Sequence, residues 1–220
     1  MFNFSQDDRR LCCEGFSPAG NAVILSGMRQ NNSHNVDAWI CVYCGSRDGL
    51  NPAYRAAASA LGEALAQARL GLVYGGAQVG LMGAVADAAL AAGAPVYGVI
   101  PRGLAEREVA HQGLTELSVV ETMHQRKLAM INASDGFIAM PGGFGTLEEL
   151  FEVLTWHQIG WHDRPAGLLD VDGFYQPLIA CMNHMRDQGF VPDAHVARIA
   201  VSEQPAALVE QMMAKLAIQA

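Results

Sequence analysis

The sequence predicts an α/β protein with a Rossmann-like, doubly wound parallel sheet in a single domain. From about residue 39 onward, short apolar runs alternate with segments of helical composition, the pattern of βαβ units. The runs are apolar throughout, as expected for strands buried on both faces. The chain has 220 residues, of which 51% are hydrophobic and 16% charged, so it can bury one sizeable core and is not a disordered chain.

The first half of this domain predicts three strands and two helices. Residues 39–44 form an apolar run that ends at a Gly-Ser pair, which indicates a buried strand. The alanine-rich segment 52–68 begins with Pro52, a residue that suits the first turn of a helix. A strand at 70–74 is stopped by two glycines, and Gly93 stands where the C-terminal cap of the next helix belongs. The elements expected here are strands at 39–44, 70–74 and 95–100, and helices at 52–68 and 81–92.

The second half continues the alternation. Its clearest element is the helix 146–159, whose leucines and isoleucine recur at helical spacing. The elements expected here are strands at 117–120, 136–140, 166–169 and 199–201, and helices at 123–133, 146–159, 175–186 and 205–218.

Residues 1–37 differ from the rest because they show no sustained period of 2 or 3.6. We expect them to be a flexible or non-native N-terminal extension, with Met28 as a plausible alternative start, and we expect the Rossmann-like domain to span 38–220. The segment lacks the basic start and long apolar stretch of a secretory signal.

Charge and cysteine content restrict the partners. The formal net charge of −8 disfavours binding to nucleic-acid backbones. The chain contains five cysteines, an odd number, which is not typical of a disulfide-stabilised scaffold. This cysteine content favours a reducing compartment, the cytoplasm. The apolar segment 71–101 contains a single charged residue, Asp87, but its glycines and prolines split it into shorter pieces, so we expect no membrane span.

Three strand-to-helix turns are rich in glycine: residues 44–47, 74–83 and 141–146. Ligands of such sheets bind beyond the carboxyl ends of the strands. Glycine allows a ligand to approach backbone N–H groups, and helix N-termini add unpaired donors. Any one turn could serve packing alone, but together they predict a phosphate site that includes Ser46, Gly75 and Gly76. No dinucleotide or nucleoside-triphosphate signature is present, which favours a monophosphate over NAD or ATP.

The charged residues near these turns allow two interpretations. Thr146 and Glu149 have the spacing of a capping box, in which Glu149 would bond only to the backbone; alternatively, Glu149 contacts the ligand. Arg126 and Lys127 are either a solvated basic pair or an anion site, since cations near a helix N-terminus are unfavourable unless an anion offsets them.

We interpret the remaining candidate residues as structural. Cys41 and Cys44 have redox-like spacing but lie in an expected buried strand, so we interpret them as core. His124 could be a base, although a surface histidine is the commoner case. There is no second Cys-x-x-Cys pair for zinc, and we expect no metal.

Two segments resemble signatures of one family. Residues 141–149 match P-G-G-x-G-T-x-x-E, and residues 123–127 read M-H-Q-R-K. The chain resembles the LOG family of cytokinin riboside 5′-monophosphate phosphoribohydrolases, once widely labelled "possible lysine decarboxylase". The resemblance runs from about Ile40 to Val201. The turn at Gly75 and Gly76 departs from it, because Ala77 stands where the family usually has a third glycine.

This resemblance implies a dimeric hydrolase. It would cleave the N-glycosidic bond of adenosine 5′-monophosphates, including N6-modified ones, and release free base and ribose 5-phosphate without a cofactor. The alternatives are a broader nucleoside monophosphate nucleosidase and a non-catalytic nucleotide or cofactor carrier. The resemblance implies Arg126 and Glu149 as the catalytic pair. The implied substrate-binding residues are Glu108, Lys127, Gly142, Gly143, Phe144, Gly145 and Thr146.

Overall fold

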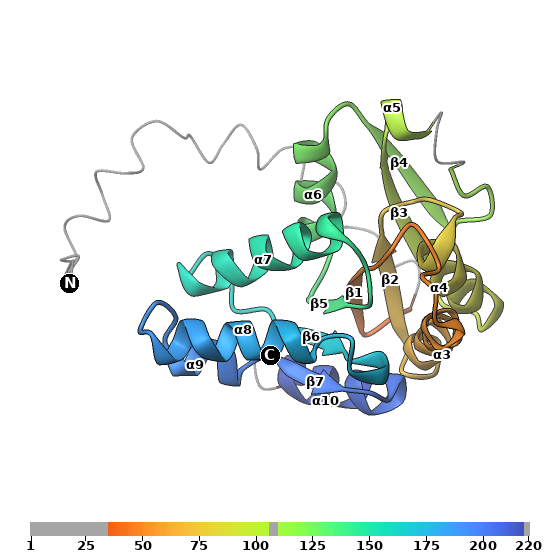
Figure 1. Cartoon of the computed structure of the whole chain (residues 1–220). Helices are drawn as coiled ribbons and strands as arrows, with labels where there is room; N and C mark the ends of the chain where they lie inside the picture. The colour runs from red at the N-terminus through yellow and green to blue at the C-terminus, as the bar shows by residue number, and fades with distance from the viewer. Residues whose placement is uncertain (1–34, 106–109, 218–220) are drawn as a thin grey trace. The chain divides into compact units, whose positions relative to one another are not determined.

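The computed structural model describes residues 35–105 and 110–217 and contains one seven-stranded sheet (Figure 1). The strand order is β4-β3-β2-β1-β5-β6-β7, and every neighbouring pair is parallel. All seven expected strands are present. The predicted α/β architecture with one parallel sheet is therefore confirmed. Their bounds are β1 Ala38–Tyr43, β2 Leu70–Tyr74, β3 Val96–Pro101, β4 Glu116–Val120, β5 Gly136–Ala139, β6 Ala166–Leu169 and β7 Ala200–Ser202.

The six expected helices are also present. They are α3 Pro52–Gln67, α4 Gly80–Ala91, α6 Met123–Asn132, α7 Phe144–Gln158, α8 Gln176–Asp187 and α10 Pro205–Ala217. Among the helices that contribute to the site, α7 differs most from the prediction. It begins at Phe144, two residues before the expected start at residue 146. Three short elements were not predicted: α5 Arg102–Ala105, the 3-10 helix η2 Val171–Gly173 and α9 Asp193–Ala197.

Helices cover both faces of the sheet. Successive side chains of a strand point to opposite faces, so Ile40 and Val42 of β1 pack with α3, α4 and α10, whereas Cys41 and Tyr43 pack with α6 and α7.

The cysteines are core residues, as expected: Cys41 and Cys44 are buried, unpaired and in different apolar clusters, and burial raises the pKa of both thiols well above the usual range.

The chain reverses its winding direction beside β1, because β1 pairs with β2 on one side and with β5 on the other. The loops that follow β1 and β5 therefore diverge and leave a crevice at the carboxyl edge of the sheet. The Gly45 N–H donates to the Pro141 carbonyl at 3.1 Å, and the Leu81 N–H donates to the Gly45 carbonyl at 3.1 Å. The three glycine-rich turns thus meet at one point.

Gly80 shows how closely these turns approach. It has a φ of +58°, and a Cβ atom there would lie 2.4 Å from the carbonyl carbon of Ser46, so a larger residue would both strain the backbone and separate the turns.

The apolar segment 71–101 is divided among β2, α4 and β3. Within the part of the chain that the structure describes, no helix combines the length and apolar character needed to cross a bilayer. The same residues contain no cluster of three His, Cys, Asp or Glu side chains arranged to hold a metal ion.

Candidate active site

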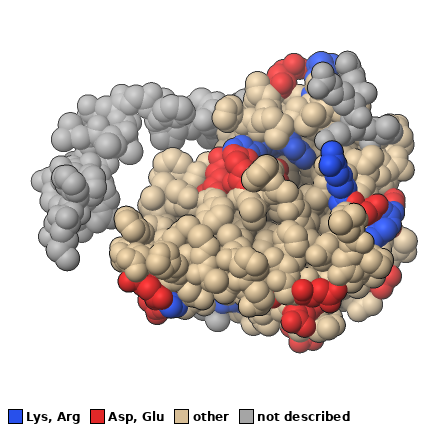
Figure 2. Space-filling view, in the orientation of Figure 1, with Lys and Arg blue, Asp and Glu red and all other residues tan. Residues whose placement is uncertain are grey.

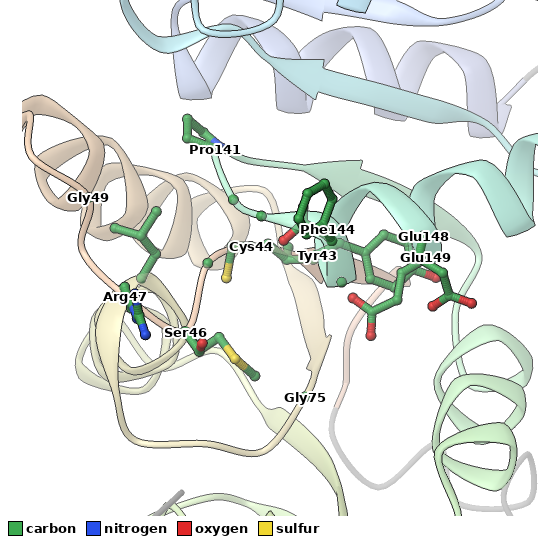
Figure 3. Close-up of a pocket in the computed structure, with 18 of the residues that line it drawn as sticks. Tyr43, Cys44, Ser46, Arg47, Gly49, Gly75, Pro141, Phe144, Glu148 and Glu149 are labelled. Carbon is green, nitrogen blue, oxygen red and sulfur yellow. The ribbon is translucent and has the colours of Figure 1, made fainter.

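A cavity of about 590 Å³ opens at the point where the glycine-rich turns meet (Figure 3). Its wall combines the turns after β1 and β5, the start of α7, and side chains of α4 and α6. Acidic and basic side chains gather near the middle of the face shown in Figure 2, in the region between α6 and α7, while most of that face is uncharged. Nine of the predicted site residues line the cavity: Ser46, Gly75, Arg126, Gly142, Gly143, Phe144, Gly145, Thr146 and Glu149.

The start of α7 presents free backbone donors to this cavity. Gly143 is the N-cap residue and supplies no side-chain cap. The first helical N–H bond of α7 is that of Leu147 to the Gly143 carbonyl at 3.2 Å, so the N–H groups of the three preceding residues have no partner within the helix. Such a terminus, with its partial positive charge, suits an anion such as a phosphate.

This geometry excludes the capping-box interpretation of Glu149. Thr146 is the third residue of α7 rather than its N-cap, and Glu149 is the sixth. The capping-box alternative is therefore wrong here. A capping box does occur at α6, where Thr122 is the N-cap and the Gln125 side chain reaches back to it.

Arg126 is held against the ends of two strands. Its side chain is buried, and Nε donates to the Val99 carbonyl at 3.2 Å while Nη2 donates to the Gly75 carbonyl at 3.1 Å. Among the described residues, Nη1 faces only the Met123 sulfur, a weak acceptor, at 3.9 Å. This nitrogen can therefore donate to a ligand in the cavity, and the interpretation of Arg126 as a solvated surface cation is wrong.

Gly75 makes the position of Arg126 sterically allowed. A Cβ atom at Gly75 would lie 1.8 Å from Nη2 of Arg126 and 2.3 Å from the methyl carbon of Met82. Any side chain at this turn would displace the guanidinium, so the glycine is required for packing as well as for ligand approach.

Glu149 lies partly buried on the cavity wall and lacks a hydrogen-bond donor among the described residues. Burial raises the pKa of its carboxyl group from 4.5 to about 7; Arg126 and Lys127 lower this pKa, whereas the Glu148 and Glu152 carboxylates raise it. A carboxyl group that titrates near neutrality can exchange a proton at physiological pH, as a general base must.

Glu148 also lines the cavity, and sequence reasoning missed it. Figure 3 shows the Glu148 and Glu149 carboxylates next to each other on the same wall. Glu148 forms a close ion pair with Lys127, which also contacts Glu152 at 3.2 Å. The consecutive glutamates were visible in the sequence, but only the pairing across α6 and α7 separates their roles.

Three predicted site residues fall elsewhere. Lys127 is buried between α6 and α7 and does not line the cavity. Gly76 lies behind the wall, with a φ of +77°, and its carbonyl accepts the N–H of His111 at 3.1 Å. Glu108 lies outside the described residues. Arg47 and Met82, which belong to the predicted turns 44–47 and 74–83, also line the cavity, whereas Tyr43, Met123, Met130 and Phe174 line it without having been predicted.

Comparison with known sequences identifies relatives along most of the chain. Residues 82–212 match the family described as "Possible lysine decarboxylase". A cytokinin riboside 5′-monophosphate phosphoribohydrolase of Arabidopsis thaliana is 50% identical over 152 residues, covering 69% of this chain and 70% of the relative. The enzyme of that name from Rhodococcoides fascians is 48% identical over 163 residues, covering 74% and 82%.

Comparison with solved structures supports the fold. The molybdenum cofactor binding protein of Rippkaea orientalis superposes with a TM-score of 0.61 at 21% identity, covering 80% of this chain and 96% of that protein. The Moco carrier protein of Chlamydomonas reinhardtii gives 0.60 at 21% identity, covering 81% and 98%. These similarities concern the fold alone. On the sequence matches, the chain belongs to the LOG family, the family whose members carry the description "possible lysine decarboxylase".

Proposed function

We propose that this chain hydrolyses the N-glycosidic bond of adenosine 5′-monophosphates, including N6-modified ones, to free base and ribose 5-phosphate. The observation that carries the proposal is the combination in one cavity of three features: the uncapped start of α7, the buried Arg126 guanidinium whose Nη1 has only a weak acceptor among the described residues, and a carboxyl group, Glu149, with a pKa of about 7. The relatives in Arabidopsis thaliana and Rhodococcoides fascians are named for this activity.

The phosphate is assigned to the start of α7. The N–H groups of Phe144, Gly145 and Thr146 would bind its oxygens, and the turns that contain Ser46 and Gly142 complete the wall. Holding the phosphate there fixes the ribose beside Glu149, which lies further along the same helix. Phosphate binding energy is thereby used to position the scissile bond.

Glu149 is assigned two roles in the cleavage. Its carboxylate would face the ribose as positive charge develops on C1′ and O4′, by analogy with the oxocarbenium-like transition state of glycoside hydrolysis. It would also accept a proton from the attacking water, whose oxygen forms the new bond to C1′. The base leaves with the bonding electron pair and takes up a proton.

Arg126 is assigned to the anionic parts of the reaction. Two of its nitrogens are fixed by backbone carbonyls, so the third can donate to the phosphate or the departing base with little loss of side-chain entropy. Arg126 and Glu149 are the proposed catalytic pair.

The decarboxylase description fits the site poorly. Pyridoxal phosphate would require a lysine able to form a Schiff base, which favours a lowered pKa. The chain has only two lysines, Lys127 and Lys215. Neither lines the cavity. Burial lowers the pKa of the Lys127 ammonium, but its bonds to Glu148 and Glu152 outweigh burial and raise that pKa above 10.5.

A non-catalytic carrier is the second candidate, because the structural neighbours include cofactor carriers of the same fold. Such a protein would keep the backbone donors at α7 but would not need a carboxyl group poised near neutrality. The presence of Glu149 beside Arg126 therefore favours catalysis.

We also propose a cytoplasmic homodimer that binds neither nucleic acid nor membranes. The net charge of −8 supports the last two points. Exposed apolar side chains near the cavity, Phe144 and Met123, suit a protein contact. A monomer mass in light scattering at all concentrations would refute the dimer.

The test of function is a substrate panel. The protein is incubated with AMP, isopentenyladenosine monophosphate, GMP, CMP and UMP, and chromatography measures the released base and ribose 5-phosphate. We expect both products in equal amounts from the adenine nucleotides. Nucleotide binding is measured by calorimetry in parallel, and binding without product in every case would favour the carrier. A separate reaction with lysine tests the decarboxylase, which release of carbon dioxide would favour.

A further inference from the structure

Arg126 and Lys127 are adjacent on α6, yet their side chains leave in different directions. The Arg126 guanidinium reaches the carboxyl ends of β2 and β3 and the cavity, while the Lys127 ammonium reaches α7. Both residues are 8% exposed, so neither is free to swing into solvent. The two cations of this pair therefore act in different places.

Two carboxylates accept hydrogen bonds from the Lys127 ammonium group. Glu148 and Glu152 are four residues apart on α7 and so lie on the same side of the helix. Nζ of Lys127 donates to Oε1 of Glu148 in a close ion pair and to Glu152 at 3.2 Å. Two of the three ammonium hydrogens are thereby used, and Lys127 offsets the repulsion between two like charges.

The surroundings of Lys127 argue against contact with a phosphate. The Glu148 carboxylate, whose side chain is 56% exposed, lies on the cavity wall, whereas Lys127 is not among the lining residues. A phosphate that approached the ammonium from the cavity would meet this negative charge first. The start of α7 and Arg126 offer an anion a less obstructed position.

We infer that Lys127 is a positioning residue, which holds Glu148 at the cavity wall and balances the charge around Glu149, rather than a ligand of the substrate phosphate. The inference rests on the proposed function, because it assigns a role within that site. A residue that acts in this way should affect the protonation of Glu149 and leave phosphate affinity largely unchanged.

Among residues 35–105 and 110–217, the charged and titratable groups that act on Glu149 lie on α6, on α7 and at β1. They are Arg126 and Lys127 on α6, Glu148 and Glu152 on α7, and Cys41 and Tyr43 on β1, with Cys44 directly after it. Burial raises the pKa values of the β1 groups and of Cys44, so these groups stay neutral at physiological pH. Within the described part of the chain, the balance at Glu149 is therefore set by two cations and two carboxylates, and removal of Lys127 leaves these carboxylates in excess.

The test compares Lys127→Met, Lys127→Arg and Lys215→Met. Lys215 is the other lysine of the chain and lies in the last turn of α10, away from the cavity, so its variant is the matched control. Two quantities are measured: the pH dependence of kcat/KM for AMP, and the competitive inhibition constant of ribose 5-phosphate.

We expect Lys127→Met to move the acidic limb of the profile upward by about one pH unit, the usual effect of losing one neighbouring opposite charge. Its inhibition constant for ribose 5-phosphate should stay within about twofold of the parent value. Lys127→Arg should restore the limb, and Lys215→Met should match the parent protein in both measurements.

The inference is overturned if Lys127→Met weakens ribose 5-phosphate by about tenfold or more, the loss expected for a charge-assisted hydrogen bond, or if the acidic limb does not move. Should Lys127→Met fail to fold, Lys127→Gln replaces it, because a neutral amide can still donate to Glu148 and Glu152, and the same criteria apply. If the parent protein hydrolyses no nucleotide, the proposed function fails. Titration of the Glu149 carboxyl by ¹³C NMR in the parent and in Lys127→Met then tests the inference alone.

Discussion

Replacement of Glu149 by glutamine should make the protein more stable and almost inactive. Glutamine keeps the shape of the side chain but carries no charge at any pH. In the folded parent protein the carboxyl group has a pKa of about 7, against an ordinary value of 4.5, mainly because of burial. The ionised carboxylate is therefore unfavourable in the folded state, and the variant never has to accommodate it.

The direction in which stability changes with pH follows from how many protons the folded and unfolded states bind. Between pH 4.5 and 7 the folded state keeps a proton on Glu149 that the unfolded state releases, so the stability of the parent protein falls as pH rises through this window. At about 1.4 kcal/mol per pH unit, the interval of 2.5 units corresponds to roughly 3.5 kcal/mol. Partial contact of Glu149 with solvent reduces the expected effect toward about 2 kcal/mol.

The assay is urea unfolding of the parent and Glu149→Gln proteins at pH 4.5 and pH 8. We expect equal stabilities at pH 4.5 and an advantage for the variant of about 2 to 3 kcal/mol at pH 8. Glu63→Gln, at an exposed position of α3, is the control for loss of one surface charge. In the same preparations, AMP hydrolysis by Glu149→Gln should fall on the order of 10²-fold or more.

Two results would contradict this reasoning. An advantage of Glu149→Gln that is the same at both pH values would show that burial does not disfavour the Glu149 charge. A near-parental rate in the folded variant would remove Glu149 from the catalytic pair.

Further predictions concern the pH profile, Arg126, Gly75 and the N-terminal segment. The rate of the parent protein should rise with pH through about 7, since Glu149 must lose its proton to act as a base, and a rate independent of pH from 5 to 9 would count against this. Arg126→Ala should lower kcat/KM on the order of 10²- to 10³-fold, with little recovery in Arg126→Lys, because an ammonium cannot replace the fixed guanidinium; substantial rescue by lysine would contradict the assignment. Gly75→Ala should reduce activity comparably by displacing Nη2 of Arg126, whereas Gly103→Ala, where an added Cβ meets nothing within 4 Å, should behave as the parent does. A chain that starts at Met28 should fold and retain its rate, because the core residues of the described structure all lie at or after Ile40; loss of soluble protein on expression would refute this.

Two-sided burial explains why the sheet could be predicted from the sequence. The inner strands β1, β2, β3, β5 and β6 are apolar runs because helices cover them on both faces, and glycine-rich turns follow β1, β2 and β5. The edge strand β4 is partly exposed and contains Glu116. The position of the cavity followed from the same pattern, since the carboxyl ends of parallel strands share one edge.

The start of α7 was harder to predict because Thr146 has the residue type and spacing of a good N-cap. The helix instead begins at Phe144 with Gly143 as its N-cap, which leaves backbone donors facing the cavity. Local propensity favoured a side chain that would satisfy the helix end, whereas the structure keeps that end open for a ligand.

The different roles of Arg126 and Lys127 could not be read from the sequence either. Adjacent residues on a helix point about 100° apart, so their partners depend on which elements pack on each side of α6. Only the assembled fold brings Val99 and Gly75 to one side chain and Glu148 and Glu152 to the other.

We propose that phosphate binding at the start of α7 positions a glycosidic bond beside Glu149. The most direct test is the ratio of kcat/KM for AMP to that for adenosine, measured as adenine release in a single assay. Because adenosine lacks the phosphate group that α7 would bind, we expect a ratio on the order of 10² or more. Equal values for AMP and adenosine would contradict it.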